Sequence, residues 1–241
     1  MKHILAIDTS TAWCSVALSL GEAAPLFRHE LVSAGASQLL LPWVDVLLKE
    51  ANLTLKDLAA IAVGIGPGAF TGVRLGVAVV QGLAVSCELP ILPVASLDAI
   101  AAQTMHTAAF KKIQAKNLVI AIDARMDEIY WAHYETSQNN QSAIRIGDIH
   151  LSKPEEIDLS NTPYLAGSAL KAYGNRLFTN VSSPLPPASL DAEINITSLG
   201  VLNCAQQLLN EGRQCDVRHL EPMYVRNKVA LTTAERQEAF K

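Results

Sequence analysis

The stretch Gly64-Ile-Gly-Pro-Gly-Ala-Phe-Thr-Gly-Val-Arg74 decides the fold, because it places a glycine-rich turn directly before an apolar helix. The run from Leu75 to Cys87 that follows contains only two polar side chains, Gln81 and Ser86. We predict a helix from about Thr71 to Glu88. A helix that is apolar all round has to be covered on every face. One face can pack on its own domain, so the pattern indicates that a partner covers the other.

A second segment of the same character runs from Gln38 to Glu50 and is helical by composition. Pro42 is tolerated there only near the first turn of the helix, where a missing N–H matters least. The apolar residues of this segment cover more than a single face, so it also needs two packing surfaces. The two helices together are the candidate partner interface.

Composition bounds the size of the fold and its function. With 241 residues, 50% of them hydrophobic, the chain can bury a real core in one large or two small domains, and we favour two. The formal net charge of −4 at pH 7 provides no basic surface for RNA or DNA. If nucleic acid is involved, a partner has to supply the charge.

The sequence shows no sign of export or of membrane insertion. Residues Met1–Asp8 lead straight into a strand pattern and lack the features of a signal peptide. The apolar helix, taken as roughly 13 residues, is shorter than the ~20 needed to cross a bilayer. The four cysteines have no C-x-x-C spacing and are interpreted as thiols in a reducing compartment. We therefore expect a cytoplasmic protein without a membrane partner.

A partial repeat indicates two similar lobes. Asn117–Asp123 resembles His3–Asp8, because each is a buried strand that ends in Ala-Ile-Asp and is followed by a tight turn and an outward strand. We predict an α/β chain with an N-terminal lobe over residues 1–108, which holds the partner-binding helices. A smaller C-terminal lobe follows over 109–220. The tail, residues 221–241, is expected to return in part to the N-terminal lobe.

A carboxylate followed by hydroxyls marks the end of the first strand. Asp8 can hold Mg²⁺ through water, while the N–H and hydroxyl groups of Thr9, Ser10 and Thr11 face phosphate oxygens. The same residues also initiate ordinary hairpins. Arg74 opposes the helix dipole at the start of the apolar helix, so it needs a carboxylate, a phosphate or a partner group beside it. The candidate nucleotide or phosphate site therefore consists of Asp8, Thr9, Ser10 and Arg74.

The glycine turn formally satisfies the G-x-G-x-x-A pattern of dinucleotide sites, but Pro67 lacks the N–H that a phosphate cradle needs. We favour a structural interpretation, in which the glycines permit unusual backbone angles. Gly72 and Gly76, one helical turn apart, are expected to let another helix approach closely.

No residue is predicted to be catalytic or to bind a metal. The six histidines never fall at the H-x-x-x-H spacing of metal sites, and no G-x-S-x-G elbow occurs. The turn Asp123-Ala-Arg-Met-Asp-Glu128 gathers charge at a hairpin tip, where it can form a local ion-pair network or a surface for partner contact. A merely solvated hairpin tip is the commoner case.

Four motifs together resemble those of the bacterial TsaB (YeaZ) family: Ile4–Ser10, Gly66–Arg74, Ala121–Tyr130 and Glu221–Arg226. The resemblance spans almost the whole chain. It implies an actin-like, Hsp70-like ATPase (ASKHA) fold of two lobes with a reduced second lobe. It also implies a role in forming threonylcarbamoyladenosine next to the anticodon of tRNAs that read codons beginning with A.

In that family TsaD, a paralogue, is the catalytic subunit, TsaE is an ATPase that joins the complex, and TsaB is a scaffold or activator. The resemblance therefore implies TsaD and TsaE as partners, a homodimer through the same surface, and tRNA contact only through the complex. It implies no cofactor of the chain's own, and it allows ATP or ADP and a metal ion in the complex. The residues expected to bind the partner are Leu39, Leu40, Trp43, Val44, Leu47, Gly72, Val73, Gly76, Val77 and Val80.

Family members often carry a histidine at the start of the first helix, where this chain has Gly35-Ala-Ser37, so a contact made by that histidine is not carried over. The alternative function is a stand-alone ATP-dependent kinase or ATPase, suggested by the turn after Asp8 and by the duplicated lobes. Against it, the region after Asn161 offers only Ala166-Gly-Ser168 for adenosine contacts. A protease acting on TsaD has no catalytic constellation to support it.

Overall fold

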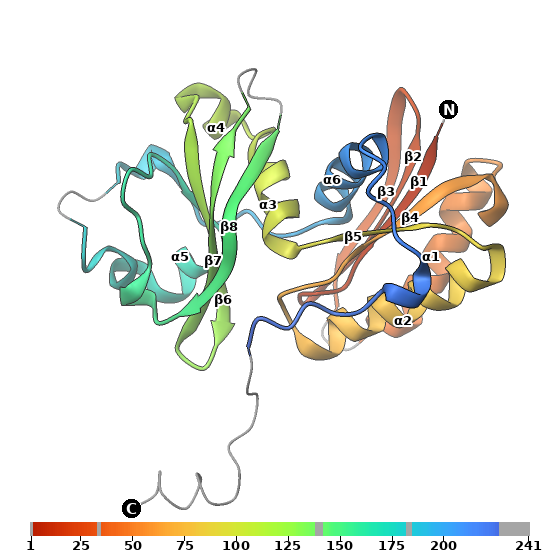
Figure 1. Ribbon diagram of the computed structural model, residues 1–241, viewed down its shortest axis with the longest axis horizontal. Coiled ribbons are helices and arrows are strands. Elements are labelled where there is room, and N and C mark those ends of the chain that lie inside the picture. Colours follow the sequence, from red (N-terminus) through yellow and green to blue (C-terminus); the bar gives the residue numbers. More distant parts are fainter. Residues whose placement is uncertain (1, 33–34, 138–141, 182–184, 227–241) are drawn as a thin grey trace, which may run out of the picture.

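The computed structural model describes residues 2–32, 35–137, 142–181 and 185–226. These residues form two lobes, each built around one five-stranded sheet, and Figure 1 shows the two sheets at opposite ends of the molecule. The predicted α/β class and the two-lobed organisation are confirmed. The part of the expected tail from residue 227 onward lies outside the described residues.

The first sheet has the strand order β3-β2-β1-β4-β5. Strands β1 to β3 form an antiparallel meander, and β4 and β5 run parallel to β1. Both faces of β1 are covered, which explains why this strand is an unbroken apolar run in the sequence. The strands are β1 (His3–Asp8), β2 (Trp13–Leu20), β3 (Ala23–Leu31), β4 (Leu58–Gly64) and β5 (Ile91–Val94).

The second sheet repeats this topology. Its order, written β8-β7-β6-β9-β10, has an antiparallel meander followed by two parallel strands, as in the first sheet. The duplication expected from the two Ala-Ile-Asp strands is therefore confirmed. A reduced second lobe is not confirmed, because all five strand positions are kept, although the last two strands are short. The strands are β6 (Asn117–Arg125), β7 (Glu128–Thr136), β8 (Ala143–Ser152), β9 (Leu165–Ala166) and β10 (Leu190–Asp191).

Helices α1 (Ala36–Glu50) and α2 (Phe70–Cys87) cover one face of the first sheet. Their buried residues join those of β1, β2 and β4 in a single core. Pro42 is the seventh residue of α1, and not in its first turn as expected. The helix accommodates it because Pro42 and Gln38 both face solvent, so water can bind the carbonyl group that loses its partner.

The other face of the first sheet packs against α6 (Ser198–Asn210), which also contacts α3 (Ser96–Thr104). Figure 1 shows α6 beside the first sheet and α3 between the two sheets. A single boundary at residue 108 would place α6 in the second lobe. The structure corrects this expectation, because α6 buries Val201 and Ala205 against the first lobe. One core contains these helices and the inner faces of both sheets, so the lobes share a hydrophobic interior. The remaining α-helices are α4 (Ala108–Ile113) and α5 (Ala169–Tyr173), and the 3₁₀ helices are Leu55–Asp57, Pro154–Glu156, Gly174–Phe178, Pro187–Ser189 and Val217–His219.

After α6 the chain runs back along the first lobe. Cys215 exchanges two backbone hydrogen bonds of 2.9 Å with Ile91, and Gln81 of α2 donates to the carbonyl oxygen of Leu220. We call residues Glu221–Arg226 the C-terminal strap. The Met223 N–H donates to the carbonyl oxygen of Ile65, so the predicted return of the tail to the first lobe is confirmed for the strap.

Helix α2 has 18 residues and is longer than the apolar stretch taken from the sequence. By length and composition it could cross a membrane, a property that core helices of soluble proteins share. In the structure one side of this helix belongs to the core of the first lobe.

Candidate functional site

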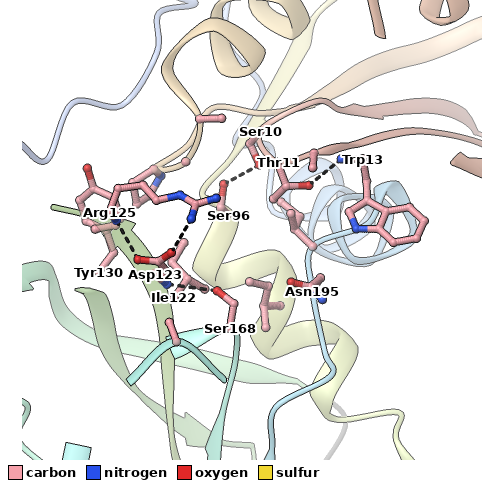
Figure 2. A pocket seen from close by; sticks show the side chains of 18 of the residues that line it. Ser10, Thr11, Trp13, Ser96, Ile122, Asp123, Arg125, Tyr130, Ser168 and Asn195 are labelled. Carbon is pink, nitrogen blue, oxygen red and sulfur yellow. Dashed lines mark hydrogen bonds and ion pairs between the residues drawn. The ribbon is translucent and has the colours of Figure 1, made fainter. Parts of the chain in front are cut away.

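A cavity of about 460 Å³ lies between the two lobes. Figure 2 shows Ser10, Thr11 and Trp13 on its first-lobe side, opposite Asp123 and Arg125 at the end of β6. Figure 2 also labels Ser96, Tyr130, Ser168 and Asn195 among the lining residues. The sequence offered Ser168 within Ala166-Gly-Ser168, and no motif marked Asn195.

Asp8 ends β1 and lies beneath this cavity without lining it. Its side chain is 1% exposed, and Oδ1 accepts hydrogen bonds from the N–H and the hydroxyl of Ser10, both at 3.1 Å. Oδ2 has no hydrogen-bond partner and lies against the backbone of Gly64. Burial raises the pKa of Asp8 to about 7, although the two bonds from Ser10 oppose that shift.

The glycine turn packs directly on the turn between β1 and β2. The Ala69 N–H donates to the carbonyl oxygen of Ser10 at 2.6 Å. A Cβ atom at Gly68 would overlap that same oxygen, and one at Gly72 would overlap the carbonyl oxygen of Thr9. The structural interpretation of the glycines is confirmed, but the expected role of Gly72 is corrected. It admits the β1–β2 turn of the same chain, not a second helix.

The prediction that Gly76 admits a second helix is corrected in the same way, because its Cα faces the hydroxyl of Thr9 and the side chain of Val63. Thr9 in turn donates its hydroxyl proton to the carbonyl oxygen of Gly72 at 2.7 Å. The two turns and the start of α2 therefore form one closely packed unit.

These contacts decide whether the turn fits a metal-bound phosphate, the group that the expected ATPase fold implies. The Asp8 carboxylate is sealed from the cavity, and the donors of Ser10 and Ala69 are used inside the protein. Of Asp8, Thr9, Ser10 and Arg74, only Ser10 lines the cavity. The residues present do not fit a phosphate held by Asp8 and a metal ion. Among the described residues, no group of three His, Cys, Asp or Glu side chains could hold a metal ion.

Asp123, the counterpart of Asp8 in the second lobe, does face the cavity. Its Oδ1 accepts hydrogen bonds from the Tyr173 hydroxyl at 2.9 Å and the Arg125 N–H at 2.8 Å, and Oδ2 pairs with the Arg125 guanidinium at 3.3 Å. The repeat in the sequence is the signal that points to Asp123. The two related aspartates thus have opposite environments, one buried with a free oxygen and one hydrogen-bonded at the cavity wall.

The tip of the β6–β7 hairpin has three consecutive residues in the left-handed region, Arg125 (φ 61°), Met126 (φ 57°) and Asp127 (φ 62°). Such angles are unfavourable for residues other than glycine, so surrounding contacts must hold them. Arg176 binds Asp127 through two hydrogen bonds of 2.5 and 3.0 Å. From the C-terminal strap, Arg226 binds the Ala124 carbonyl at 3.1 Å and the Glu128 carboxylate at 2.5 Å. The ion-pair network considered for this turn is confirmed, and it leaves the Arg125 side chain 88% exposed.

Arg74 lies outside the interlobe cavity, on the exposed side of α2. Its guanidinium carbon is 3.4 Å from the centre of the Phe70 ring, and Nε and Nη2 donate to the Tyr224 hydroxyl at 3.0 and 2.9 Å. Among the described residues, no carboxylate lies within ion-pairing distance of this guanidinium. The groups beside Arg74 in this chain are therefore the aromatic side chains of Phe70 and Tyr224. The described residues do not supply the carboxylate that the sequence analysis considered for Arg74.

The expected partner-binding residues divide into two groups by exposure. Leu39, Trp43 and Gly72 are partly exposed. The other seven are buried in the first lobe itself. The prediction that they contact a partner is corrected, because they pack against the sheet and cannot also form a docking surface. They are Leu40, Val44, Leu47, Val73, Gly76, Val77 and Val80.

The outward face of α2 is a row of residues three or four positions apart: Thr71, Arg74, Ala78, Gly82 and Val85. This row, which we call the α2 outer row, has a 65% exposed valine at its end, and a Cβ atom at Gly82 would have open space around it. The polar residues Thr71 and Arg74 could have identified this face from the sequence, since outward residues recur every three or four positions. On the neighbouring helix, Leu41 is 49% and Val46 is 40% exposed.

In comparisons with known proteins, the matching family model and two of the similar proteins carry names that refer to threonylcarbamoyladenosine or its transfer. The family model described as "TsaD: tRNA N6-adenosine threonylcarbamoyltransferase" matches residues 29–231. The chain is 35% identical to "tRNA threonylcarbamoyladenosine biosynthesis protein TsaB" of Escherichia coli, over 95% of this chain and 96% of that protein. The protein of the same name from Haemophilus influenzae is 34% identical over 94% of each chain.

Two solved structures from Pseudomonas aeruginosa have the same fold. One, described as an uncharacterized protein with similarity to peptidase YEAZ, has a TM-score of 0.80 and 36% identity, over 94% of this chain and 100% of that chain. The other, described as YeaZ, has a TM-score of 0.78 and 35% identity, over 93% of this chain and 100% of that chain.

Proposed function

The chain belongs to the TsaB (YeaZ) family, and from this premise we propose that it takes part in forming threonylcarbamoyladenosine in tRNA as a docking subunit without catalysis of its own. The names of the two TsaB relatives support the pathway. The engaged donors around Asp8 and the apolar outer surface of the first lobe support the docking role.

One observation carries the docking role: Gly82 sits in the middle of α2, on its outer row, with no contact that requires a glycine. A glycine inside a helix costs about 1 kcal/mol relative to alanine. The other α2 glycines, Gly72 and Gly76, have packing reasons within the chain, and Gly82 has none. A small residue beside Ala78 and Val85 allows the backbone of another helix to approach closely, which explains its use here.

The proposed partner is TsaD, the catalytic subunit to which the resemblance points, and TsaE is proposed to join the complex. The match of the TsaD-type family model to most of this chain is consistent with pairing between related folds. A homodimer through the α2 outer row is proposed as the resting form. Because the chain has a net charge of −4, it is proposed to reach tRNA only through the complex. The complex is proposed to be cytoplasmic, to have no membrane partner, and to take ATP or ADP and a metal ion outside this chain.

Docking and activity are tested together with purified proteins. Isothermal titration calorimetry measures the Kd between this chain and TsaD of the same organism, and modification of tRNA is assayed with TsaD, TsaE and a threonylcarbamoyl donor. Because Val85 is 65% exposed on the α2 outer row, Val85→Asp is expected to raise the Kd at least ten-fold and to lower modification in parallel. Its thermal unfolding midpoint is expected to stay that of the unmodified chain.

Ile144→Asp is the matched control. Ile144 is 56% exposed on β8 of the second lobe, far from α2, so the Kd is expected to stay within about three-fold. The proposal is contradicted by modification of tRNA or steady ATP turnover by the isolated chain, or by a Val85→Asp variant that binds TsaD normally.

A further inference from the structure

A second cavity, of about 210 Å³, lies between the glycine turn, the β6–β7 hairpin and the C-terminal strap. Phe70 and Val73 line it from α2, Tyr130 lines it from β7, and Met223 and Val225 line it from the strap. These five side chains present mainly apolar surface. We call this space the strap cavity.

The walls of the strap cavity are held in place by hydrogen bonds. The Met223 N–H donates to the Ile65 carbonyl at 2.8 Å, and the Tyr224 hydroxyl accepts from Arg74. Arg226 ties the end of the strap to the Ala124 carbonyl. The strap is therefore bound to both lobes, and the cavity exists before any ligand arrives.

The rim of the strap cavity is unusually apolar for a surface. The lining residues Phe70 and Tyr224 are 44% and 54% exposed, and Met126, which contacts the lining residue Arg226 through its sulfur atom, is 71% exposed. They are three of the nine large apolar residues that are exposed in the described part of the chain, and the Phe70 and Tyr224 rings contact each other. Exposed apolar residues gathered around a pocket mark an interaction site more than scattered ones do.

The charge at this rim is positive. Among the described residues, the Arg74 guanidinium contacts the aromatic side chains of Phe70 and Tyr224 and no carboxylate. Arg125 pairs with one carboxylate, that of Asp123, while its side chain remains 88% exposed. Arg226 is already neutralised by Glu128. The rim thus offers two guanidinium groups to an acidic group from outside the chain.

We propose that the strap cavity receives one apolar side chain of the partner protein, and that an acidic residue next to it pairs with Arg74 and Arg125. The proposal rests on the proposed docking function and extends the α2 outer row, since Arg74 belongs to both surfaces. A buried anchor surrounded by a rim that excludes water is the usual source of affinity at protein interfaces. The occupant is a side chain and not a nucleotide, because 210 Å³ is below the roughly 300 to 1,000 Å³ of small-molecule sites.

Two variants test this cavity by the Kd for TsaD of the same organism. Ala69→Leu adds bulk at an exposed residue that lines the cavity, and Ala69 has backbone angles (φ −63°, ψ 117°) that leucine adopts readily. Arg125→Glu reverses the exposed charge at the rim. Each is expected to raise the Kd at least ten-fold, and the effect of Arg125→Glu is expected to shrink as salt is raised.

Ala172→Leu is the matched control for Ala69→Leu, because Ala172 is an exposed alanine that lines the interlobe cavity and not the strap cavity. Its Kd is expected to stay within about three-fold. If Val85→Asp weakens binding but Ala69→Leu and Arg125→Glu do not, the strap cavity is not an anchor site while the docking function stands. If Val85→Asp also has no effect, both proposals fail.

A titration of the chain with ATP tests whether the strap cavity binds a nucleotide instead of a side chain of the partner. No heat of binding, or binding that Ala69→Leu leaves unchanged, agrees with a protein anchor. Loss of ATP binding in Ala69→Leu together with an unchanged Kd for TsaD overturns the proposal. Arg125→Glu changes a side chain that is 88% exposed and removes its ion pair with Asp123, so its Kd decides the matter even if Ala69→Leu does not fold.

Discussion

Asp8 is a buried acid whose environment differs from what its position suggests. The end of a first strand is a typical place for a metal-binding carboxylate, yet here Ser10 and Gly64 enclose the side chain. Enclosure disfavours the charged form, which is why the pKa of Asp8 rises from 3.8 to about 7. Its role in this chain is therefore to hold the β1–β2 turn beneath the glycine turn.

This environment predicts a pH dependence of folding. The unfolded chain loses the Asp8 proton near pH 3.8 and the folded chain near pH 7, so the folded state binds the proton more tightly between these values. The stabilisation from the protonated acid is fully present below pH 3.8 and is lost as the pH rises through 7. It amounts to at most about 4 kcal/mol, since one pKa unit corresponds to about 1.4 kcal/mol.

Urea unfolding at pH 5 and pH 8 measures this effect. Asp8→Asn is expected to remove most of the fall in the free energy of unfolding between the two pH values, because asparagine does not titrate. Asp123→Asn, at the equivalent position of the second lobe, is expected to keep that fall. An Asp8→Asn variant with the pH dependence of the unmodified chain would show that Asp8 is ionised in the folded protein.

At the scale of the element, one face of α2 packs on the first sheet, and the opposite face makes no contact that the fold requires. The buried side follows the positions of Val73, Val77, Val80 and Ala84, which pack on the sheet. The outer row lies on the opposite side and ends in exposed Val85. Because both sides are apolar, the helix has no polar stripe to separate them, and only Thr71, Arg74 and Ser86 mark the outside.

The two kinds of glycine in α2 give a matched prediction. Gly72→Ala places a Cβ atom on the Thr9 carbonyl, so it is expected to lower the free energy of unfolding by about 1–3 kcal/mol. Gly82→Ala has open space and is expected to raise it by about 1 kcal/mol. Urea unfolding at low protein concentration measures both. Equal effects of the two substitutions would contradict the assignment of the two faces.

The β6–β7 hairpin is a second element whose geometry depends on other parts of the chain. Three left-handed residues in a row do not follow from the local sequence Arg125-Met-Asp127. Arg176 and the C-terminal strap hold them, and the consequence is that the Arg125 guanidinium stands at the rim of two cavities.

At the scale of the whole molecule, the lobes are joined twice. On one side α3 and α6 share a core with both sheets, and on the other the C-terminal strap runs from Ile65 of the first lobe to the β6–β7 hairpin. The shared core is large, so we expect the chain to unfold as one unit. The strap depends on a few hydrogen bonds and is therefore the part expected to open first.

Hydrogen exchange tests this order of opening. Arg226→Ala removes the contacts with Ala124 and Glu128, so the Met223 amide is expected to exchange at least ten-fold faster, while amides of β1 are unchanged. Arg218→Ala is the control, since in the described part of the chain Arg218 pairs only with exposed Asp216 near the strap. Equal acceleration of Met223 and of the β1 amides in Arg226→Ala would mean that the strap opens only by global unfolding.

The sequence by itself determined the local structure and the relatives of this protein. Unbroken apolar runs predict the buried strands, the paired Ala-Ile-Asp motifs predict the duplicated sheets, and the glycine turn predicts the start of α2. These features depend on neighbours along the chain, whose spacing reflects the geometry of strands and helices.

Only the tertiary structure decided which side of α2 faces outward, that Asp8 is sealed, and that α6 crosses to the first lobe. Each of these depends on contacts between residues far apart in the sequence, such as Ser15 with Ser198 or Arg226 with Glu128. In α2 only Thr71, Arg74 and Ser86 mark the outer side, and the apolar residues between them carry no local signal for which side is buried. The packing of the sheet beneath it makes that choice, because burying one face leaves the other for a partner.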